Sequence, residues 1–356
     1  MSSDESKNLI EEAIKKIVLD PMEPENYLQL GKLYVVKAEY DLALNIYESL
    51  LKIDSMNVQA LVNSGSIYFY KLEFSKAINN YSRAVEIETD NYSIYFNLGN
   101  AYAEVGNHKQ AMQNYIRAMN LKPDDPAIYS AIGLLYQDLG DYIEAKLYYE
   151  RALKLDCENS ENYMNLACVL MKLNMFSEAA GYFKKALELD PSDPKIALCC
   201  ANAYSANEDF ANAAEYFQKT IALKEDYYQA YVCYAISLCD QNKIENAIEY
   251  YKKAIEIGPE ISNAYTLLAN LYVSEQNYNQ AVSLYKKVVE LEPRSSHPLM
   301  LMGNTYVMMK NLKSALQVYK RAVDLDSEND EMKLVYLEIA SEYIDQKFEK
   351  EEESVV

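Results

Sequence analysis

A pattern of small and aromatic residues recurs every 34 residues in this chain, from Pro24 to Asn329, without an insertion or a deletion. One position of the pattern is alanine in all nine units: Ala43, Ala77, Ala111, Ala145, Ala179, Ala213, Ala247, Ala281 and Ala315. A fixed period of roughly 20 to 50 residues is typical of repeat proteins, in which each unit buries its apolar face on its neighbours. The period therefore limits the chain to a linear array of small, similar units.

A large aromatic residue follows each of these alanines four positions later, so both lie on one face of a helix. The aromatic residues are Tyr47, Tyr81, Tyr115, Tyr149, Phe183, Phe217, Tyr251, Tyr285 and Tyr319. Earlier in each unit, apolar or small residues at unit positions 4, 7, 8 and 11 predict another helix, as in Tyr95, Leu98, Gly99 and Tyr102. We therefore expect each unit to be a helical hairpin, with helices over about unit positions 1–14 and 15–30.

Residues that break helices are scarce and fall at the expected joints. The chain has only nine Gly and nine Pro. Five prolines come just after the second helix of a unit, at Pro21, Pro123, Pro191, Pro259 and Pro293. Because an all-β or α/β chain of this length needs many more turn residues, the composition favours an all-α fold.

The pattern resembles the tetratricopeptide repeat, which has aromatic-Leu-Gly-Tyr in its first helix and Ala-Phe/Tyr-Ala-Pro in its second. Phe183-Lys-Lys-Ala186-Leu-Glu-Leu-Asp-Pro191 is similar to the second half of that motif. The resemblance covers about nine tenths of the chain. It implies a right-handed α-solenoid with a concave groove, lined mainly by the first helix of each unit, that holds a segment of another protein.

These boundaries divide the chain into four parts. Residues 1–23 are an acidic segment with a capping helix, residues 330–348 are a second capping helix, and residues 349–356 are an acidic, disordered tail. The nine units between them are 24–57, 58–91, 92–125, 126–159, 160–193, 194–227, 228–261, 262–295 and 296–329.

The net charge and the lengths of the apolar runs argue against several kinds of partner. The formal charge is −20, from 54 acidic and 34 basic residues, which argues against binding to the phosphates of nucleic acids. There is no apolar leader and no uninterrupted apolar run near the length of a membrane span. Six unevenly spaced cysteines indicate free thiols in a reducing compartment. We expect a soluble, cytoplasmic protein without a membrane partner.

Asparagines at unit positions 6 and 9 are expected to face the groove. They are Asn63, Asn97 and Asn165 at position 6, and Asn100, Asn202, Asn270 and Asn304 at position 9. A side-chain amide both donates and accepts hydrogen bonds, which suits an extended peptide backbone. The position-6 set partly resembles the asparagine ladder in the tetratricopeptide superhelix of protein O-GlcNAc transferases. In the alternative interpretation, these asparagines cap helices or face solvent.

Apolar residues at groove positions gather toward the two ends of the array. They are Val35, Val36, Phe69 and Tyr70 near the start, and Met300, Leu301, Val307 and Met308 near the end. Exposed apolar patches commonly mark partner sites. Positions 5 and 12 also suit packing between adjacent units, but Tyr70 and Met308, at position 13, are harder to assign to a core.

Other sites are not supported by the residues. A site for Hsp70 or Hsp90 would resemble the carboxylate clamp of co-chaperones, which has Lys at position 5 of one unit and basic residues at positions 2 and 6 of a later unit. No unit of this chain has Lys at position 5. Lys195 is the one basic residue at position 2, and position 6 of its unit is Cys199. Cys168, Cys199, Cys233 and Cys239 approach the groove, yet the chain has only two histidines and no CxxC pair. We find no catalytic motif and expect neither a metal nor a cofactor. Ser354-Val355-Val356 has the form of a short ligand for PDZ domains.

The sequence therefore predicts a non-enzymatic adaptor that binds a peptide or helix of a partner protein in its groove. The alternative is a subunit that recruits substrates or regulates an enzyme assembly, such as a glycosyltransferase, ubiquitin-ligase or transport complex. A third hypothesis is a scaffold that associates with itself. The residues do not identify the partner, the pathway or the oligomeric state.

Overall fold

The computed structural model describes the backbone of residues 3–353 and the side chains of residues 8–347. Twenty α-helices and no strands are present in this part of the chain, which confirms the all-α prediction. The helices are α1 (Ser3–Leu19), α2 (Pro24–Val36), α3 (Tyr40–Ile53), α4 (Val58–Tyr70), α5 (Phe74–Ile87), α6 (Tyr92–Glu104), α7 (His108–Leu121), α8 (Pro126–Asp138), α9 (Tyr142–Leu155), α10 (Ser160–Lys172), α11 (Phe176–Leu189), α12 (Pro194–Ala206), α13 (Phe210–Leu223), α14 (Tyr228–Asp240), α15 (Ile244–Ile257), α16 (Ser262–Ser274), α17 (Tyr278–Leu291), α18 (His297–Met308), α19 (Leu312–Leu325) and α20 (Asp330–Glu353).

Helix boundaries from α2 to α19 follow the 34-residue period of the sequence. The first helix of each pair covers unit positions 1–13, except that α18 begins one residue later, and the second covers positions 17–30. The expected end of the first helix at position 14 and start of the second at position 15 were therefore slightly off. Positions 14–16 form the turn between the two helices.

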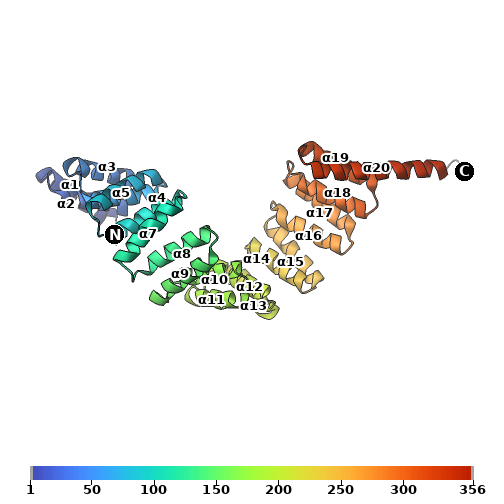
Figure 1. The fold of residues 1–356 in the computed structure, drawn as a ribbon, viewed down its shortest axis with the longest axis horizontal. Coiled ribbons are helices and arrows are strands. Elements are labelled where there is room, and N and C mark those ends of the chain that lie inside the picture. The colour runs from blue at the N-terminus through green and yellow to red at the C-terminus, as the bar shows by residue number, and fades with distance from the viewer. Residues whose placement is uncertain (1–2, 354–356) are drawn as a thin grey trace. The chain divides into compact units, whose positions relative to one another are not determined.

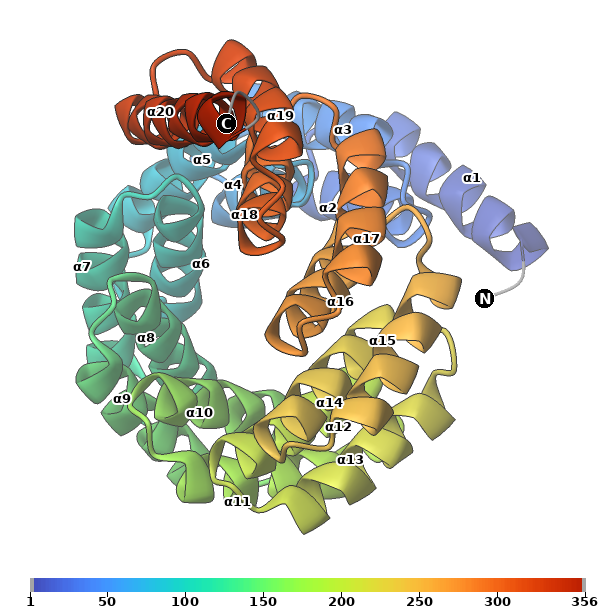
Figure 2. The same cartoon turned by 90° about the vertical axis from the view of Figure 1, so that its right-hand side faces the viewer.

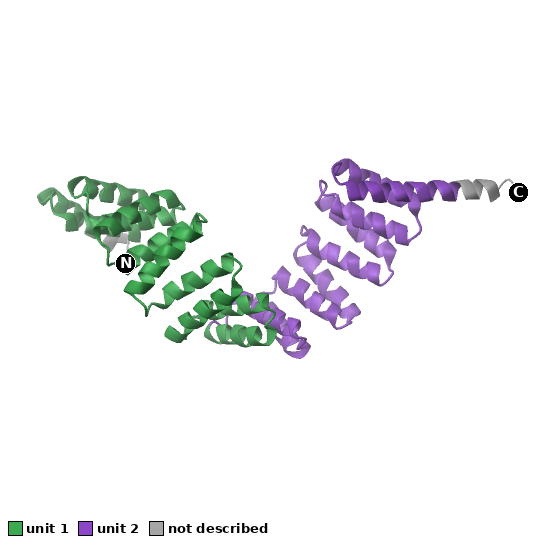
Figure 3. Cartoon of the chain, in the orientation of Figure 1, with its two compact units in different colours: residues 1–189 green, residues 190–356 purple. Residues whose placement is uncertain are grey.

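The chain forms two compact units, residues 1–189 with α1–α11 and residues 190–356 with α12–α20 (Figures 1 and 3). In each unit, the two helices of every hairpin pack on one another, and successive hairpins stack side by side. Figure 2 shows how the helices of the first unit are layered: α6, α8 and α10 lie on the inner side of its curve, and α7, α9 and α11 on the outer side. The first helix of each pair thus lines the concave face in this unit.

A left-handed residue makes the turn of every hairpin, at unit position 15. Gly106 and Gly140 hold this position in two hairpins, with φ of 72° and 79°. Seven other residues with φ between 57° and 61° fill it elsewhere: Ala38, Leu72, Asn174, Glu208, Asn242, Gln276 and Lys310. In the hairpin of α4 and α5, the N–H of Leu72 donates to the Phe69 carbonyl at 2.9 Å and that of Glu73 donates to the Tyr68 carbonyl at 2.8 Å. This is a Schellman motif, which satisfies carbonyl groups at the helix end.

Small residues at unit position 8 make room for the aromatic ring at position 24. A Cβ atom added to Gly31 would lie 2.3 Å from Cε1 of Tyr47, and one added to Gly303 would lie 2.5 Å from Cε2 of Tyr319. The aromatic side chain itself is buried in each pair; Tyr47, for example, is 1% exposed. Close packing of the two helices therefore depends on a ring lying against a backbone.

Single helices lie at both ends of the array. α1 packs on α2, and α20 packs on α19. α20 runs to Glu353, so its backbone continues through residues 349–353, which were expected to be disordered. The rest of that segment, including Ser354-Val355-Val356, lies outside the described residues.

Candidate partner-binding groove

A pocket of about 510 Å³ opens where α2, α3 and α4 meet in the first unit. We call it the groove pocket. Its lining residues are Lys32, Val35 and Val36 from α2, Tyr40 and Tyr47 from α3, and Asn63, Ser66, Ile67 and Tyr70 from α4. This volume is within the range of pockets that hold small ligands or anchoring side chains, roughly 300 to 1,000 Å³.

Apolar and aromatic side chains form the mouth of the groove pocket. Val36 is 72% exposed and Tyr70 is 67% exposed, although both are large enough to be favoured in a core. The rings of Tyr40 and Tyr70 lie with their centroids 4.8 Å apart. A hydrogen bond with Tyr70 raises the pKa of the Tyr40 hydroxyl. The two tyrosines thus form a neutral aromatic wall beside an exposed valine.

Polar groups at the base of the pocket come from Tyr47 and the predicted residue Asn63. The amide nitrogen of Asn63 donates to the Tyr47 hydroxyl at 3.3 Å, which connects the second hairpin to the first. Burial raises the pKa of Tyr47 to about 12, so its hydroxyl is neutral at physiological pH. The base therefore offers hydrogen-bonding groups without a charge.

Lys32 is the one charged side chain that lines the groove pocket, and it forms no ion pair with any side chain that the structure describes. It stands at unit position 9, where four of the other eight units have Asn. This unpaired cation lies beside apolar side chains and makes the pocket locally positive, although the chain as a whole has a formal charge of −20. A ligand with a carboxylate next to an apolar group would match it.

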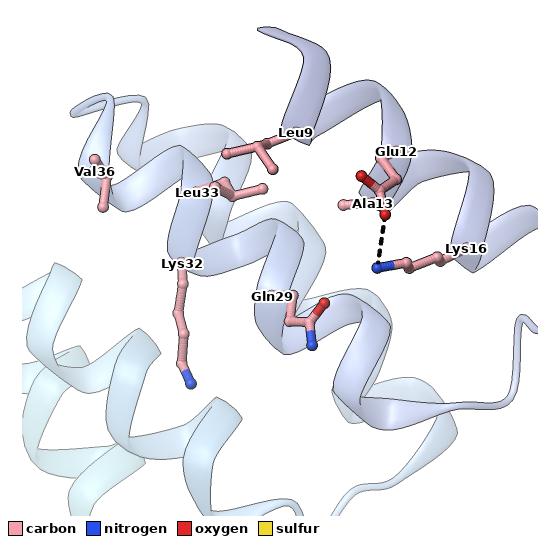
Figure 4. Close-up of a pocket in the computed structure, with 8 residues that line it drawn as sticks. All are labelled: Leu9, Glu12, Ala13, Lys16, Gln29, Lys32, Leu33 and Val36. Atoms are coloured by element: carbon pink, nitrogen blue, oxygen red, sulfur yellow. Dashed lines mark ion pairs between the residues drawn. The ribbon is translucent and has the colours of Figure 1, made fainter. Parts of the chain in front are cut away.

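A smaller pocket of about 310 Å³ lies between α1 and α2, and we call it the cap pocket (Figure 4). Leu9 of α1 and Leu33 of α2 point toward one another in it, while Glu12 and Lys16 form an ion pair at 3.1 Å. Lys32 and Val36 line both pockets. The two pockets thus adjoin, and apolar surface continues from α1 across α2 to α4.

Three of the position-9 asparagines accept hydrogen bonds from tyrosines of their own hairpins. Asn100 Oδ1 accepts from the Tyr115 hydroxyl at 2.8 Å, and Asn270 Oδ1 accepts from Tyr285 at 2.5 Å. Asn304 Oδ1 accepts from Tyr319 in the same way. The sequence did not reveal this role, in which the amide oxygen of the asparagine accepts a hydrogen bond from the hydroxyl of a buried tyrosine.

The remaining asparagines differ in their surroundings. Asn202 has Phe217 at the aromatic position of its unit and instead hydrogen-bonds to the Cys233 thiol. Asn97 and Asn165 are half-buried on α6 and α10 and make no side-chain hydrogen bond to another described residue. Asn63, Asn97 and Asn165 therefore lie on first helices of the first unit, but only Asn63 lines the groove pocket.

Met308, the predicted counterpart of Tyr70, lies at the C-terminal end of α18 in the second unit and is 54% exposed. Its neighbours Val307 and Met309 pack against the core of that unit. Tyr70 thus has a pocket around it, whereas Met308 projects as a single exposed side chain. Isolated surface apolar residues are common and carry little functional weight by themselves.

The cysteines are thiols rather than disulfides in the described part of the chain. Burial raises the pKa of the Cys168, Cys233 and Cys239 thiols, which lowers the fraction of reactive thiolate. No cluster of three or more His, Cys, Asp or Glu side chains in the described ranges is arranged to hold a metal ion. The described helices also include none with the length and apolar character needed to cross a membrane.

Two protein-family models match parts of this chain. The family model of the Cilia and flagella-associated protein 70 C-terminal domain, a domain of tetratricopeptide repeats, matches residues 48–258, which is more than half of the chain. The chain belongs to this tetratricopeptide-repeat family. The model of Anaphase-promoting complex, cyclosome, subunit 3 matches residues 240–322 of the repeat array. No curated protein sequence matches the chain.

Solved structures of other tetratricopeptide-repeat proteins have a similar fold. A tetratricopeptide repeat protein from Parabacteroides merdae is 21% identical, with a TM-score of 0.51 over 70% of this chain and 98% of that one. Yeast Tom70 is 17% identical, with a TM-score of 0.50 over 97% of this chain and 86% of that one. At this level of identity, the similarity concerns the fold. Tetratricopeptide-repeat proteins generally act as scaffolds for protein interactions.

Proposed function

We propose that this tetratricopeptide-repeat protein is a non-enzymatic adaptor whose groove pocket binds a partner segment with apolar side chains and a nearby carboxylate. The observation that carries the proposal is the joint exposure of Val36 and Tyr70 around a pocket whose single charge, Lys32, is unpaired. Burying these apolar surfaces would supply most of the binding energy, at about 25 cal/mol per Å². Lys32 would select acidic segments over basic ones.

The concave face of the first unit gives such a segment a path beyond the pocket. The half-buried amides of Asn97 and Asn165 lie on α6 and α10, which follow α4 along the inner side of the unit. We infer that they hydrogen-bond to the backbone of the bound segment, because each amide offers both a donor and an acceptor. In the second unit, the side chains of three asparagines already form hydrogen bonds within the chain, so we assign them a smaller part in partner binding: Asn202, Asn270 and Asn304.

Selection of binders from a library of random displayed peptides tests the pocket without knowledge of the partner. We expect the wild-type chain to enrich peptides with apolar side chains and an acidic residue. Tyr70→Asp should abolish this enrichment, and Lys32→Glu should shift it toward basic peptides. Met308→Asp is the matched control, since it places the same charge at the same unit position but outside the groove pocket. Equal enrichment by wild type and Tyr70→Asp would overturn the proposal.

The asparagine contribution is tested separately. Peptides selected on the wild-type chain should bind more weakly to the triple variant Asn63→Ala, Asn97→Ala, Asn165→Ala, because each lost hydrogen bond contributes about 1 kcal/mol. Circular dichroism must show unchanged helix content in this variant. If the folded variant binds these peptides with unchanged affinity, the asparagines do not contribute, and the apolar groove pocket accounts for binding by itself.

A second candidate function is that of a recruiting or regulatory subunit of an enzyme assembly. It is favoured by the match of residues 240–322 to the family of Anaphase-promoting complex, cyclosome, subunit 3. In this case the groove would present a substrate to catalysis done by another subunit. Native purification should then yield a stable complex that contains an enzyme, whereas the simple adaptor would recover partners without one.

A further inference from the structure

The last helix, α20, is built differently from the repeats. It has 24 residues, whereas α2–α19 have 12 to 14, and it extends past its neighbours in the second unit (Figures 1 and 3). One face packs on the array through Met332 and Ile339, which are 3% and 6% exposed. The opposite face exposes Leu334, Leu337 and Ile344 by 60%, 60% and 50%. α20 therefore carries an apolar stripe that no residue in the described part of the chain covers.

The exposed stripe has the spacing of a coiled-coil seam. Leu334, Leu337, Ser341 and Ile344 follow steps of three, four and three, and Phe348 continues the series in the sequence. These steps alternate between the a and d positions of a heptad, which keep one face of a helix against a partner helix. An ordinary surface helix has no reason to keep this spacing on the side away from its core.

Leu337 also shows that this face suits a helix rather than a hairpin partner. It occupies unit position 8, where all nine repeats have Gly or Ala beneath an aromatic ring. A leucine side chain at this position fills the space that the ring takes in the repeats. Packing of knobs into holes at coiled-coil distance accommodates that leucine, whereas the closer approach of the repeat hairpin does not.

Charges beside the stripe distinguish the possible occupants. The e positions are Glu338, Asp345 and Glu352, and the g positions are Lys333, Ala340 and Lys347. In a parallel pair, each g residue meets the e residue five positions later in the second helix, which matches Lys with Glu at both lysines. An antiparallel pair would place e beside e, and acidic residues would repel one another.

We propose that α20 forms a parallel two-stranded coiled coil with α20 of a second copy of this chain. Lys333 would meet Glu338 of the partner subunit, and Leu334, Leu337 and Ile344 would form the seam. In the single chain, Lys333 forms an exposed ion pair with Asp330 at 2.8 Å, which the dimer extends into a network. Because α20 is already helical and held on α19, association does not have to fold it. The dimer goes beyond the proposed groove function and uses none of the residues that line the groove pocket or the cap pocket.

Sedimentation equilibrium of the full chain over a range of concentrations tests the dimer. We expect reversible dimerisation, and Leu337→Asp should raise the dimer dissociation constant at least about 100-fold by placing a charge in the seam. Ile143→Asp on α9 is the matched control, because Ile143 is an equally exposed apolar residue, 66% exposed, in the other unit. A wild-type chain that stays monomeric, or a Leu337→Asp variant that dimerises as well, would overturn the proposal.

Charge reversal tests the parallel orientation. Lys333→Glu and Glu338→Lys should each weaken the dimer, and the double variant should restore it, since the pair across the seam is exchanged. An antiparallel dimer predicts a different result, because Glu338→Lys alone would then remove repulsion and strengthen association. That outcome would contradict the parallel arrangement.

Discussion

The hairpins of α2–α5 and α14–α17 share the same period and turns, yet they differ in what they leave exposed. α14 buries eight residues, whereas α2 buries four. At unit position 13, the first pair of hairpins has Val36 and Tyr70, and the second pair has Asp240 and Ser274. The repeat thus fixes a few core positions, and the remaining positions decide how much apolar surface a hairpin leaves exposed.

Unit position 7 shows how the later hairpins are filled. Tyr234 stacks on Phe217 with centroids 4.9 Å apart and lies 4.4 Å from the ring of Tyr250. The same position is Leu30 and Ser64 in the first two hairpins. Large rings thus fill the space around α14 and α15, where the first two hairpins have smaller side chains.

The largest effect is expected from a methyl group at the helix contact of the groove hairpin. Gly31→Ala places Cβ 2.3 Å from the Tyr47 ring, so either the ring or the backbone must move. We expect a loss of about 2 to 3 kcal/mol of stability. Gly181→Ala is the control, because its Cβ meets nothing within 4 Å and alanine favours a helix. Urea unfolding followed by circular dichroism measures both, and equal loss would contradict the ring-on-backbone contact.

Alkaline pH distinguishes hairpins with tyrosine at position 24 from those with phenylalanine. The pKa values of Tyr47 and Tyr285 are raised to about 12 by burial, from 10 in the unfolded chain. Their contribution to stability is complete below pH 10 and is lost as the pH rises through 12, by about 2 kcal/mol for each tyrosine. Tyr47→Phe should reduce this loss, as measured by urea midpoints between pH 10 and pH 12. A slope unchanged from that of wild type would refute burial as its cause.

A smaller effect is expected at the turn, where the compared hairpins agree. Leu72→Gly should stabilise the chain by up to about 1 kcal/mol, because Leu72 adopts φ of 61° with a side chain that disfavours it. Gly140→Ala should destabilise it by a similar amount, because Gly140 has φ of 79°, a conformation that a residue with a Cβ atom disfavours. Its surroundings are open, so the added Cβ atom meets no neighbour. Thermal unfolding measures both, and shifts of the same sign would contradict this assignment.

The smallest effect concerns thiol chemistry and leaves the fold intact. Cys157 is exposed between α9 and α10, whereas Cys168 and Cys233 have pKa values raised by burial. Iodoacetamide at neutral pH should therefore modify Cys157 first and the other two slowly. Mass spectrometry of the peptides gives the order of modification. Equal rates at Cys233 and Cys157 would show that the filled hairpins open readily.

Sequence patterns predicted the helices well because a helix depends on residues close together in the chain. They also predicted that Val36 and Tyr70 lie outside the core, and both are exposed. They missed Lys32 and Tyr40, because a pocket formed by three helices depends on how those helices pack. The partner of Asn100 was missed for a similar reason: the Tyr115 hydroxyl comes from the other helix of the hairpin. A polar residue fifteen positions before a tyrosine, repeated in several units, is the signal that could have shown it.

The connections between successive hairpins recur with the same 34-residue period, and this has a consequence for how such a chain gains or loses length. Because α5 meets α6 through the same type of connection by which α7 meets α8, removal of residues 92–125 would join α5 to α8 without a change of register. The array can therefore gain or lose length in whole steps of 34 residues, while any other step misplaces every later aromatic ring. The number of repeats between the two terminal helices can therefore change while α1 and α20 keep the neighbours on which they pack.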